Sequence, residues 1–183
     1  MRGPYAGARH PAPPVRYLAL AAALACAAVP ARGQSEWHEV RSDPCRFAVS
    51  FPGLVEEHQR DGEVPGATER RFRAVDGGLG FAVYCSTMPP GTLDGLDARP
   101  MLRGTVEAMG PVPGSVEAVR TGGHGGLAFV VPVEGGYVYG RTYAVGDVVL
   151  MVQVTGPAAA SPAPPAAALR FFGSLALTGG ERP

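Results

Sequence analysis

Three consecutive stretches in the second half of the chain alternate apolar or aromatic residues with other residues. They cover 127–133, 137–143 and 148–154. A period of two is typical of a strand with one buried face. Gly135-Gly136 and Gly146-Asp147 separate the stretches, and such dipeptides are common in tight hairpin turns. The alternation therefore predicts three antiparallel strands in a row, preceded by a weaker strand over 115–120.

Shorter runs of the same kind predict further strands in the first half. Residues 46–51 alternate and stop at Pro52-Gly53, which predicts one strand. The runs 68–75 and 79–86 flank the turn sequence Asp76-Gly77-Gly78 and predict a hairpin. Two polar segments lack this alternation. We expect 34–43 to be an irregular leading segment and 56–66 to be a loop.

Apolar residues at helical spacing predict a helix after the hairpin. Thr92 is the expected N-cap, because a threonine side chain accepts hydrogen bonds from free N–H groups of the first turn. Pro100 cannot donate to the carbonyl of Leu96, so the helix is expected to kink or restart there, with Pro100 in a first turn. Gly110-Pro111 ends it. The apolar positions are Leu93, Leu96, Leu102, Val106 and Met109.

A second helix is expected near the end of the chain. Residues 166–172 follow an alanine- and proline-rich segment, 157–165, and continue into an apolar run, 171–177. They predict a short helix that starts at proline and packs on the sheet. The order is strand, hairpin, helix, meander, helix. It favours an α+β fold with an antiparallel sheet of about six strands and helices packed on it, rather than a doubly wound parallel sheet.

The first part of the chain is typical of a secretory signal peptide over 1–33. An uncharged run, 17–29, is too short to span a bilayer, and small residues at Ala31 and Gly33 mark the expected cleavage site. The mature form would then be a single domain, 34–183, without a transmembrane span, in the periplasm or secreted. The positive residues before the run are Arg2, Arg9 and Arg16.

Charge argues against nucleic acid as a partner. Of 16 basic residues, all arginine, three lie before the apolar run of the signal peptide, and all 16 acidic residues lie downstream of it. A form that starts at Arg32 therefore keeps 13 arginines and carries a formal charge of −3. A net negative charge disfavours general binding to nucleic acid or to an anionic membrane.

The cysteines predict one disulfide. Cys26 lies in the signal peptide, which leaves Cys45 and Cys85. Each shares its side of an alternating strand with apolar residues, so both sulfurs should point into the core, and an exported pair is expected to be oxidised. Two unpaired buried thiols are the alternative. Cys26 is also a conceivable lipoprotein attachment site, but Ala23 and Leu24 before it fit such sites poorly.

Candidate catalytic chemistry centres on Gly122-Gly-His-Gly-Gly126, where backbone N–H groups could face an anion and His124 could act as a base. No nucleophile elbow accompanies it, and a plain turn is the favoured interpretation. His38, His58 and His124 also lack the spacing of metal ligands on one helix. No catalytic residue, metal site or cofactor is therefore expected.

Two groups of residues are candidate contact surfaces. Arg71 and Arg73 share one side of a predicted strand, and with Arg70 they form a solvated face or an anion-binding or partner-binding site. The second group shares one side of the middle meander strand. It is either an amphipathic partner surface or part of the core under a helix. This group consists of Tyr137, Tyr139, Arg141 and Tyr143.

Four segments of the exported part carry a resemblance: Phe47-Ala-Val-Ser-Phe-Pro-Gly53, Thr92-Leu-Asp94, Tyr137-Val-Tyr-Gly-Arg-Thr-Tyr143 and Arg170-Phe-Phe-Gly-Ser174. They resemble segments of exported bacterial proteins whose fold is similar to that of PsbP, the extrinsic photosystem subunit. The resemblance implies a PsbP-like α/β/α sandwich over most of the exported chain. Its segments are core and turn sequences, so it implies no functional residue.

The sequence thus favours an exported, non-enzymatic binding or assembly module. Its partner is expected to be a protein or small molecule of the cell envelope, bound at the Tyr/Arg surface or in a groove between helix and sheet. Two alternatives stay open. One is a hydrolase or metal-dependent enzyme centred on His124, and the other is a small-ligand carrier anchored as a lipoprotein through Cys26.

Overall fold

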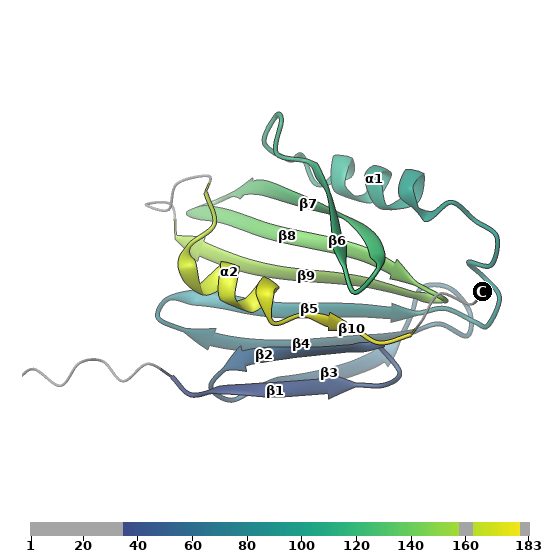
Figure 1. The fold of residues 1–183 in the computed structure, drawn as a ribbon, viewed down its shortest axis with the longest axis horizontal. Helices are drawn as coiled ribbons and strands as arrows, with labels where there is room; N and C mark the ends of the chain where they lie inside the picture. The colour runs from purple at the N-terminus through teal and green to yellow at the C-terminus, as the bar shows by residue number, and fades with distance from the viewer. Residues whose placement is uncertain (1–34, 158–162, 180–183) are drawn as a thin grey trace, which may run out of the picture. The chain divides into compact units, whose positions relative to one another are not determined.

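The computed structural model describes residues 35–157 and 163–179. Within these residues it shows ten strands and two helices, and the fold is mixed α+β (Figure 1). The predicted signal peptide, 1–33, and Cys26 lie outside the described residues, so export and the cleavage site stay predictions.

The helices are α1 (Ala98–Ala108) and α2 (Ala166–Gly173). The strands are β1 (Trp37–Ser42), β2 (Phe47–Pro52), β3 (Glu56–Asp61), β4 (Thr68–Asp76), β5 (Leu79–Thr87), β6 (Glu117–Thr121), β7 (His124–Val133), β8 (Gly136–Val145), β9 (Val148–Pro157) and β10 (Ala176–Leu177). Seven of them form a large sheet in the order β3-β4-β5-β9-β8-β7-β6, and three form a small sheet in the order β1-β2-β10.

The predicted hairpin and meander are confirmed. β4 pairs with β5 around Gly77 and Gly78, whose φ angles of 56° and 80° lie in the left-handed region that glycine tolerates. β7, β8 and β9 pair in sequence through the two predicted glycine turns. The predicted second helix is present as α2, and the weak run before the meander forms β6.

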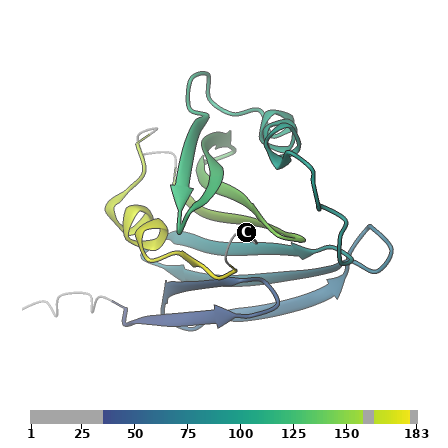
Figure 2. The ribbon, with the colours of Figure 1, turned by 45° about the vertical axis from the view of Figure 1, so that its right-hand side comes forward.

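One face of the large sheet is covered by α2 and the small sheet (Figure 2). Phe171 of α2 packs edge-to-face against Phe51 of β2 and Phe81 of β5, with ring centroids 4.9 and 5.3 Å apart. Phe47 of β2 packs against Phe72 of β4 at 5.1 Å. These rings join the small sheet, α2 and the large sheet into the main core.

The opposite face of the large sheet carries α1. Leu102 and Val106 of α1 pack against alternate residues of β7, among them Leu127 and Phe129. Successive strand residues point to opposite faces, so the residues between them face α2 instead. α1 contacts β7 and β8, which leaves the same face of β3, β4 and β5 without a helix over it.

Two strands differ from the prediction. Segments 34–43 and 56–66 were expected to lack regular structure, whereas β1 and β3 form there. Every residue of β3 is exposed, so no apolar alternation marks it in the sequence. It is held by its backbone ladder to β4 and by exposed ion pairs such as Arg60–Glu69. The large antiparallel sheet thus has seven strands where about six were expected, and β1 belongs to the separate small sheet.

The first helix begins later than predicted. The N-cap is Asp97, whose carboxylate accepts a hydrogen bond from the backbone N–H of Arg99 at 3.1 Å. Thr92 instead lies in a turn, where its hydroxyl donates to the carbonyl of Pro89. The helix starts just before Pro100, and Pro100 lies in its first turn. This agrees with the predicted restart of the helix at this proline.

The segment between β5 and α1 is anchored by Asp147, in the turn between β8 and β9. Its buried carboxylate accepts hydrogen bonds from the backbone N–H groups of Gly91 (2.9 Å) and Leu93 (3.1 Å). The N–H of Met88 also donates to the carbonyl of Asp147 at 2.8 Å. The turn therefore fixes the path by which the chain reaches α1.

A disulfide joins Cys45, just before β2, to Cys85 in β5. Both residues are buried, and their Cα atoms lie 5.8 Å apart. The predicted pairing is thus present, and it ties the small sheet to the large one. A disulfide of this kind is typical of proteins in oxidising compartments outside the cytoplasm.

Replacing both cysteines, Cys45→Ala with Cys85→Ala, should lower the free energy of unfolding by about 4 kcal/mol, because the cross-link no longer restricts a loop of about 41 residues in the unfolded chain. Denaturant unfolding with and without reductant measures this loss. Reductant should lower the stability of the wild type and leave the double variant unchanged. A double variant as stable as the oxidised wild type would contradict the prediction.

Asp147→Ala should lower the free energy of unfolding by about 2 kcal/mol, because two backbone N–H groups lose a charged acceptor. Hydrogen exchange at the amides of Gly91 and Leu93 should accelerate in this variant more than exchange elsewhere. Asp94→Ala is the matched control, since Asp94 is exposed on the same segment. Equal exchange rates in the two variants would show that the carboxylate does not anchor the segment.

Candidate functional site

The four residues of the predicted Tyr/Arg surface do share one face of β8, but two of them are core residues. Tyr139 and Tyr143 are 2% and 0% exposed, and the Tyr143 hydroxyl lies 2.9 Å from the Thr121 hydroxyl. Of the two interpretations of this group, these two residues fit the core under a helix. Tyr137 and Arg141 are half-buried and remain candidates.

Their burial follows from the cover over this face. The residues point toward α2 and the small sheet, and Tyr139 and Tyr143 belong to the core that these elements close. The ring of Tyr143 also lies across Gly126 on the neighbouring strand, where any side chain would meet it. Alternation in the sequence identified the shared face correctly, but it did not show which residues the helix covers.

Arg141 lies at the margin of that cover. Its guanidinium stacks over the ring of Phe172 in α2, 4.9 Å from the ring centroid. Among the described residues the structure shows no carboxylate paired with it. Glu117 of β6 lies in the same cross-strand row, with Ala128 of β7 between the two. A cation and an anion thus stand on either side of a small residue.

A groove of about 340 Å³ opens between α2 and strands β6, β7 and β8, and we call it the α2 groove. Arg141 and Glu117 line it, and Leu169 of α2, 53% exposed, adds an apolar wall. Ser115 fixes the chain beside it, because its hydroxyl both donates to and accepts from the backbone of Val130. The helix side of the groove was not predicted, since no sequence signal showed which strands α2 faces.

Tyr139 also lines the α2 groove. Burial, and secondly the nearby Tyr137, raise the pKa of its phenol above the ordinary value. The phenol is therefore neutral near neutral pH, and the charge available to a bound group comes from Arg141 and Glu117. The groove can hold an anion against the arginine while an apolar body contacts Leu169 and Phe172.

The three histidines considered as ligands or bases are dispersed. His38 lies on β1 and His58 on β3, and His58 lies 4.0 Å from the carboxylate of Glu56 at an exposed position. His124 begins β7 beside a turn in which Gly122 and Gly123 have positive φ angles, which confirms the turn interpretation. Within the part of the chain that the structure describes, no group of three or more His, Cys, Asp or Glu residues could hold a metal ion.

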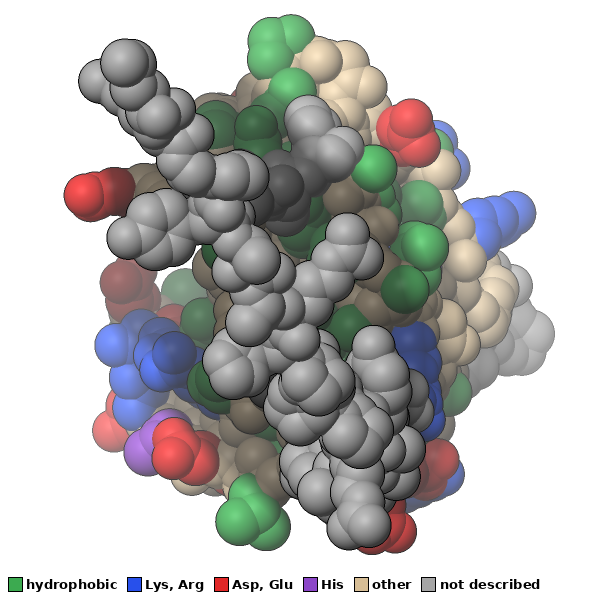
Figure 3. All heavy atoms as spheres, turned by 90° about the vertical axis from the view of Figure 1, so that its left-hand side faces the viewer, with side chains coloured by type: hydrophobic (Ala, Val, Ile, Leu, Met, Phe, Trp, Pro, Cys, Tyr) green, Lys and Arg blue, Asp and Glu red, His purple; other side chains and the backbone are tan. Residues whose placement is uncertain are grey.

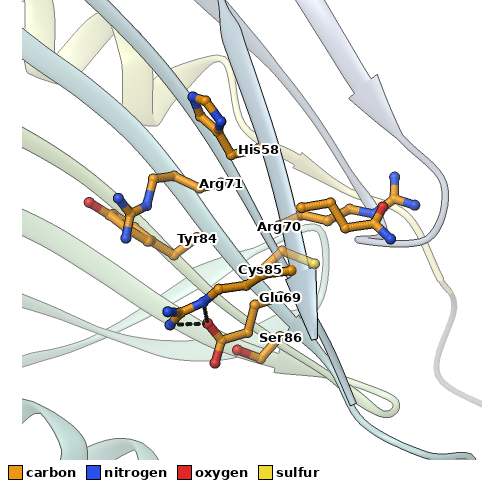
Figure 4. A pocket seen from close by; sticks show the side chains of 9 residues that line it. His58, Glu69, Arg70, Arg71, Tyr84, Cys85 and Ser86 are labelled. Atoms are coloured by element: carbon orange, nitrogen blue, oxygen red, sulfur yellow. Dashed lines mark hydrogen bonds and ion pairs between the residues drawn. The ribbon is translucent and has the colours of Figure 1, made fainter. Parts of the chain in front are cut away.

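The predicted arginine run divides between the two faces of β4. Arg70 and Arg71 point to opposite sides of the strand (Figure 4). Arg70 pairs with Glu57, whereas Arg71 and Arg73, two positions apart, are exposed on the other side. The exposed pair fits the solvated-face interpretation. The strand is not at an edge, however, because β3 pairs along its outer side.

Neither helix in the described ranges is long and apolar enough to cross a membrane. No protein-family model and no curated protein sequence matches the chain.

Solved structures do match. The solution structure of cyanobacterial PsbP (CyanoP) from Synechocystis sp. PCC 6803 covers 80% of this chain and 95% of its own, with a TM-score of 0.53 and 11% identity. A crystal structure from Bacteroides thetaiotaomicron VPI-5482 covers 79% of this chain and 48% of its own at 18% identity, with a TM-score of 0.44 that supports no conclusion. At 11% identity the first likeness concerns the fold alone. The described part of the chain has a PsbP-like α+β fold.

Proposed function

We propose that the chain is an exported, non-enzymatic binding or assembly module that binds its partner through the α2 groove. The partner is a protein or small molecule of the cell envelope that carries an anionic group beside an apolar one. The buried disulfide supports an oxidising compartment, and the PsbP-like fold is compatible with such a module.

The observation that carries this proposal is the environment of Arg141. Arg141 is half-buried, its guanidinium lies over the ring of Phe172, and no described carboxylate neutralises it. A partly desolvated arginine forms strong two-pronged hydrogen bonds with a carboxylate or phosphate, because its planar donors fit two oxygens at once. Stacking on the ring keeps the donors in place before a partner arrives.

The apolar wall supports binding to a partner with a hydrophobic part. Leu169 is 53% exposed, although α2 is a largely apolar helix whose other large apolar residues, Phe171 and Phe172, are buried. Arginine and aromatic residues are enriched at the centre of protein contacts, and the exposed leucine beside them adds apolar area. Glu117 on the far side limits the accepted ligands, because it repels a second anionic group.

No observation in the described residues favours an enzyme centred on His124. The imidazole lies beside the β6–β7 turn, and the structure gives it no described acidic partner. It also lies outside the residues that line the α2 groove. A general base needs an orienting group and space for a substrate within hydrogen-bond reach, and neither is shown at this position.

Arg141→Gln should weaken partner binding at least about tenfold, because the two-pronged charged contact is lost while the groove keeps its shape. For the measurement, a photoreactive residue is placed at position 169 of the exported, processed protein. The yield of a discrete species cross-linked from the cell envelope of its own organism then reports the binding. Arg120→Gln is the matched control, since Arg120 is exposed on the opposite side of β6 and only bonds the Gly123 carbonyl.

The variant should remain folded, with a stability loss of about 1 kcal/mol from the lost stacking on Phe172. Thermal unfolding checks this. Cross-linking of equal yield in Arg141→Gln and wild type, or the absence of any species cross-linked from position 169, would refute binding through the α2 groove.

A further inference from the structure

The uncovered half of the large sheet presents a second surface, on the face opposite the α2 groove. α1 packs mainly over β7 and β8 on this face, so β3, β4 and β5 expose side chains that a longer helix would otherwise cover. In Figure 3 one cluster of basic side chains lies at the left, with acidic side chains and a histidine beside it, and other basic side chains lie at the right. The arginines on this uncovered face are Arg60, Arg71 and Arg73.

Arg71 is held in position by an aromatic neighbour. It lies directly across from Tyr84 on β5, and its guanidinium sits 4.8 Å from the centroid of that ring (Figure 4). The amide of Gln153 on β9 donates to the hydroxyl of Tyr84 at 3.3 Å. The ring is therefore fixed by β9, and it fixes the arginine in turn.

Arg73 follows two residues later on the same face, about 7 Å further along the strand. Its cross-strand neighbours are Glu56 on β3 and Ala82 on β5. The carboxylate of Glu56 lies 4.0 Å from His58, and no described carboxylate pairs with Arg73. Arg60, by contrast, is neutralised by Glu69. Two of the arginines on this face thus keep a free positive charge.

A hollow of about 390 Å³ lies beside Arg73. Its floor is formed by small residues of β5, Gly80 and Ala82, and Tyr84 stands at one end of it. A smaller hollow of about 200 Å³ on the other side of Tyr84 includes Arg71 and His58. The larger hollow lies in the size range of small-ligand sites, and each hollow has a cation at its rim.

We propose that this surface binds a small organic anion, with a carboxylate or phosphate on Arg71 and Arg73 and an apolar body over Ala82 beside the ring of Tyr84. The planar donors of two neighbouring arginines suit one oxyanion group. The small floor residues leave room for a flat or narrow body. Gln153 and Thr155 provide polar groups along one side of that body.

The charge arrangement favours a small anion over a polyanion. Only two arginines on this face are unpaired, and Glu56 and Glu69 stand next to them. A nucleic acid would need a longer continuous basic surface. Glu134, on the opposite wall of the larger hollow, disfavours a second negative group at the far end of the ligand. The ligand therefore carries its charge at one end.

Titration of the exported form, processed by its host and labelled with ¹⁵N, tests the site. The complete probes, each with an anionic group and an apolar body, are phenyl phosphate, benzoate and hexanoate. Inorganic phosphate represents the anionic head group alone, and benzyl alcohol represents the apolar body alone. We expect saturable shifts at the amides of Arg71, Arg73, Tyr84 and Gln153 with at least one of the three complete probes. The head group and the body alone should each bind at least about tenfold more weakly, because each makes only part of the contact.

Arg73→Gln should weaken the binding at least about tenfold, because half of the cationic pair is removed. Arg70→Gln is the matched control, since Arg70 lies on the same strand, points to the other face and pairs with Glu57. Both arginines are at least partly exposed, and thermal unfolding should show both variants folded.

Three results would overturn the proposal. They are the absence of saturable shifts with all three complete probes, equal affinity in Arg73→Gln and wild type, and an equal loss in Arg70→Gln. Binding of inorganic phosphate as tightly as the complete probes would overturn the assigned apolar body. The site lies across the sheet from the α2 groove, so Arg141→Gln should leave these titrations unchanged. The two proposals therefore fail separately.

Discussion

Phe171 provides the contact on which the rest of the architecture depends. Its ring lies between Phe51 of β2 and Phe81 of β5, so a single side chain of α2 joins the helix to both sheets. Burial of aromatic surface is the largest favourable contribution that such a junction can make. The Cys45–Cys85 disulfide closes the same junction covalently. Because the small sheet and α2 share this contact, they cover most of one face of the large sheet, and the polar residues of that face lie at its margins.

The two proposed sites follow from how each face of the large sheet is covered. On one face the cover is nearly complete, and Arg141 is found where α2 ends its contact with β8. On the other face α1 packs mainly over β7 and β8, so β4 and β5 carry exposed polar side chains. Strand alternation places Arg70 and Arg71 on different faces although they are adjacent in sequence. A single strand can thus contribute a paired structural arginine and an unpaired one.

Much of the fold could be predicted because its core strands alternate strictly. The meander and the β4–β5 hairpin carry alternating apolar residues, with glycine turns between their strands. α2 is marked by Pro165 at its start and by its apolar residues. β3 could not be predicted, since each of its residues is exposed and its pairing depends on the backbone and on charges supplied by β4. Asp97 displaced Thr92 as the N-cap because Asp147, remote in sequence, holds the intervening segment away from helical geometry.

The candidate sites depended on contacts between elements that the sequence does not specify. Alternation assigned Tyr139 and Arg141 to one face of β8, yet only the position of α2 decides that the first is buried and the second stacks on Phe172. The same limit applies to Arg73, because the sequence does not show that none of the described carboxylates pairs with it, although Glu56 is its cross-strand neighbour. Parity along a strand fixes the face of a side chain, whereas its function is set by what covers that face. Partial cover leaves a cation desolvated enough to bind strongly and still accessible to a ligand.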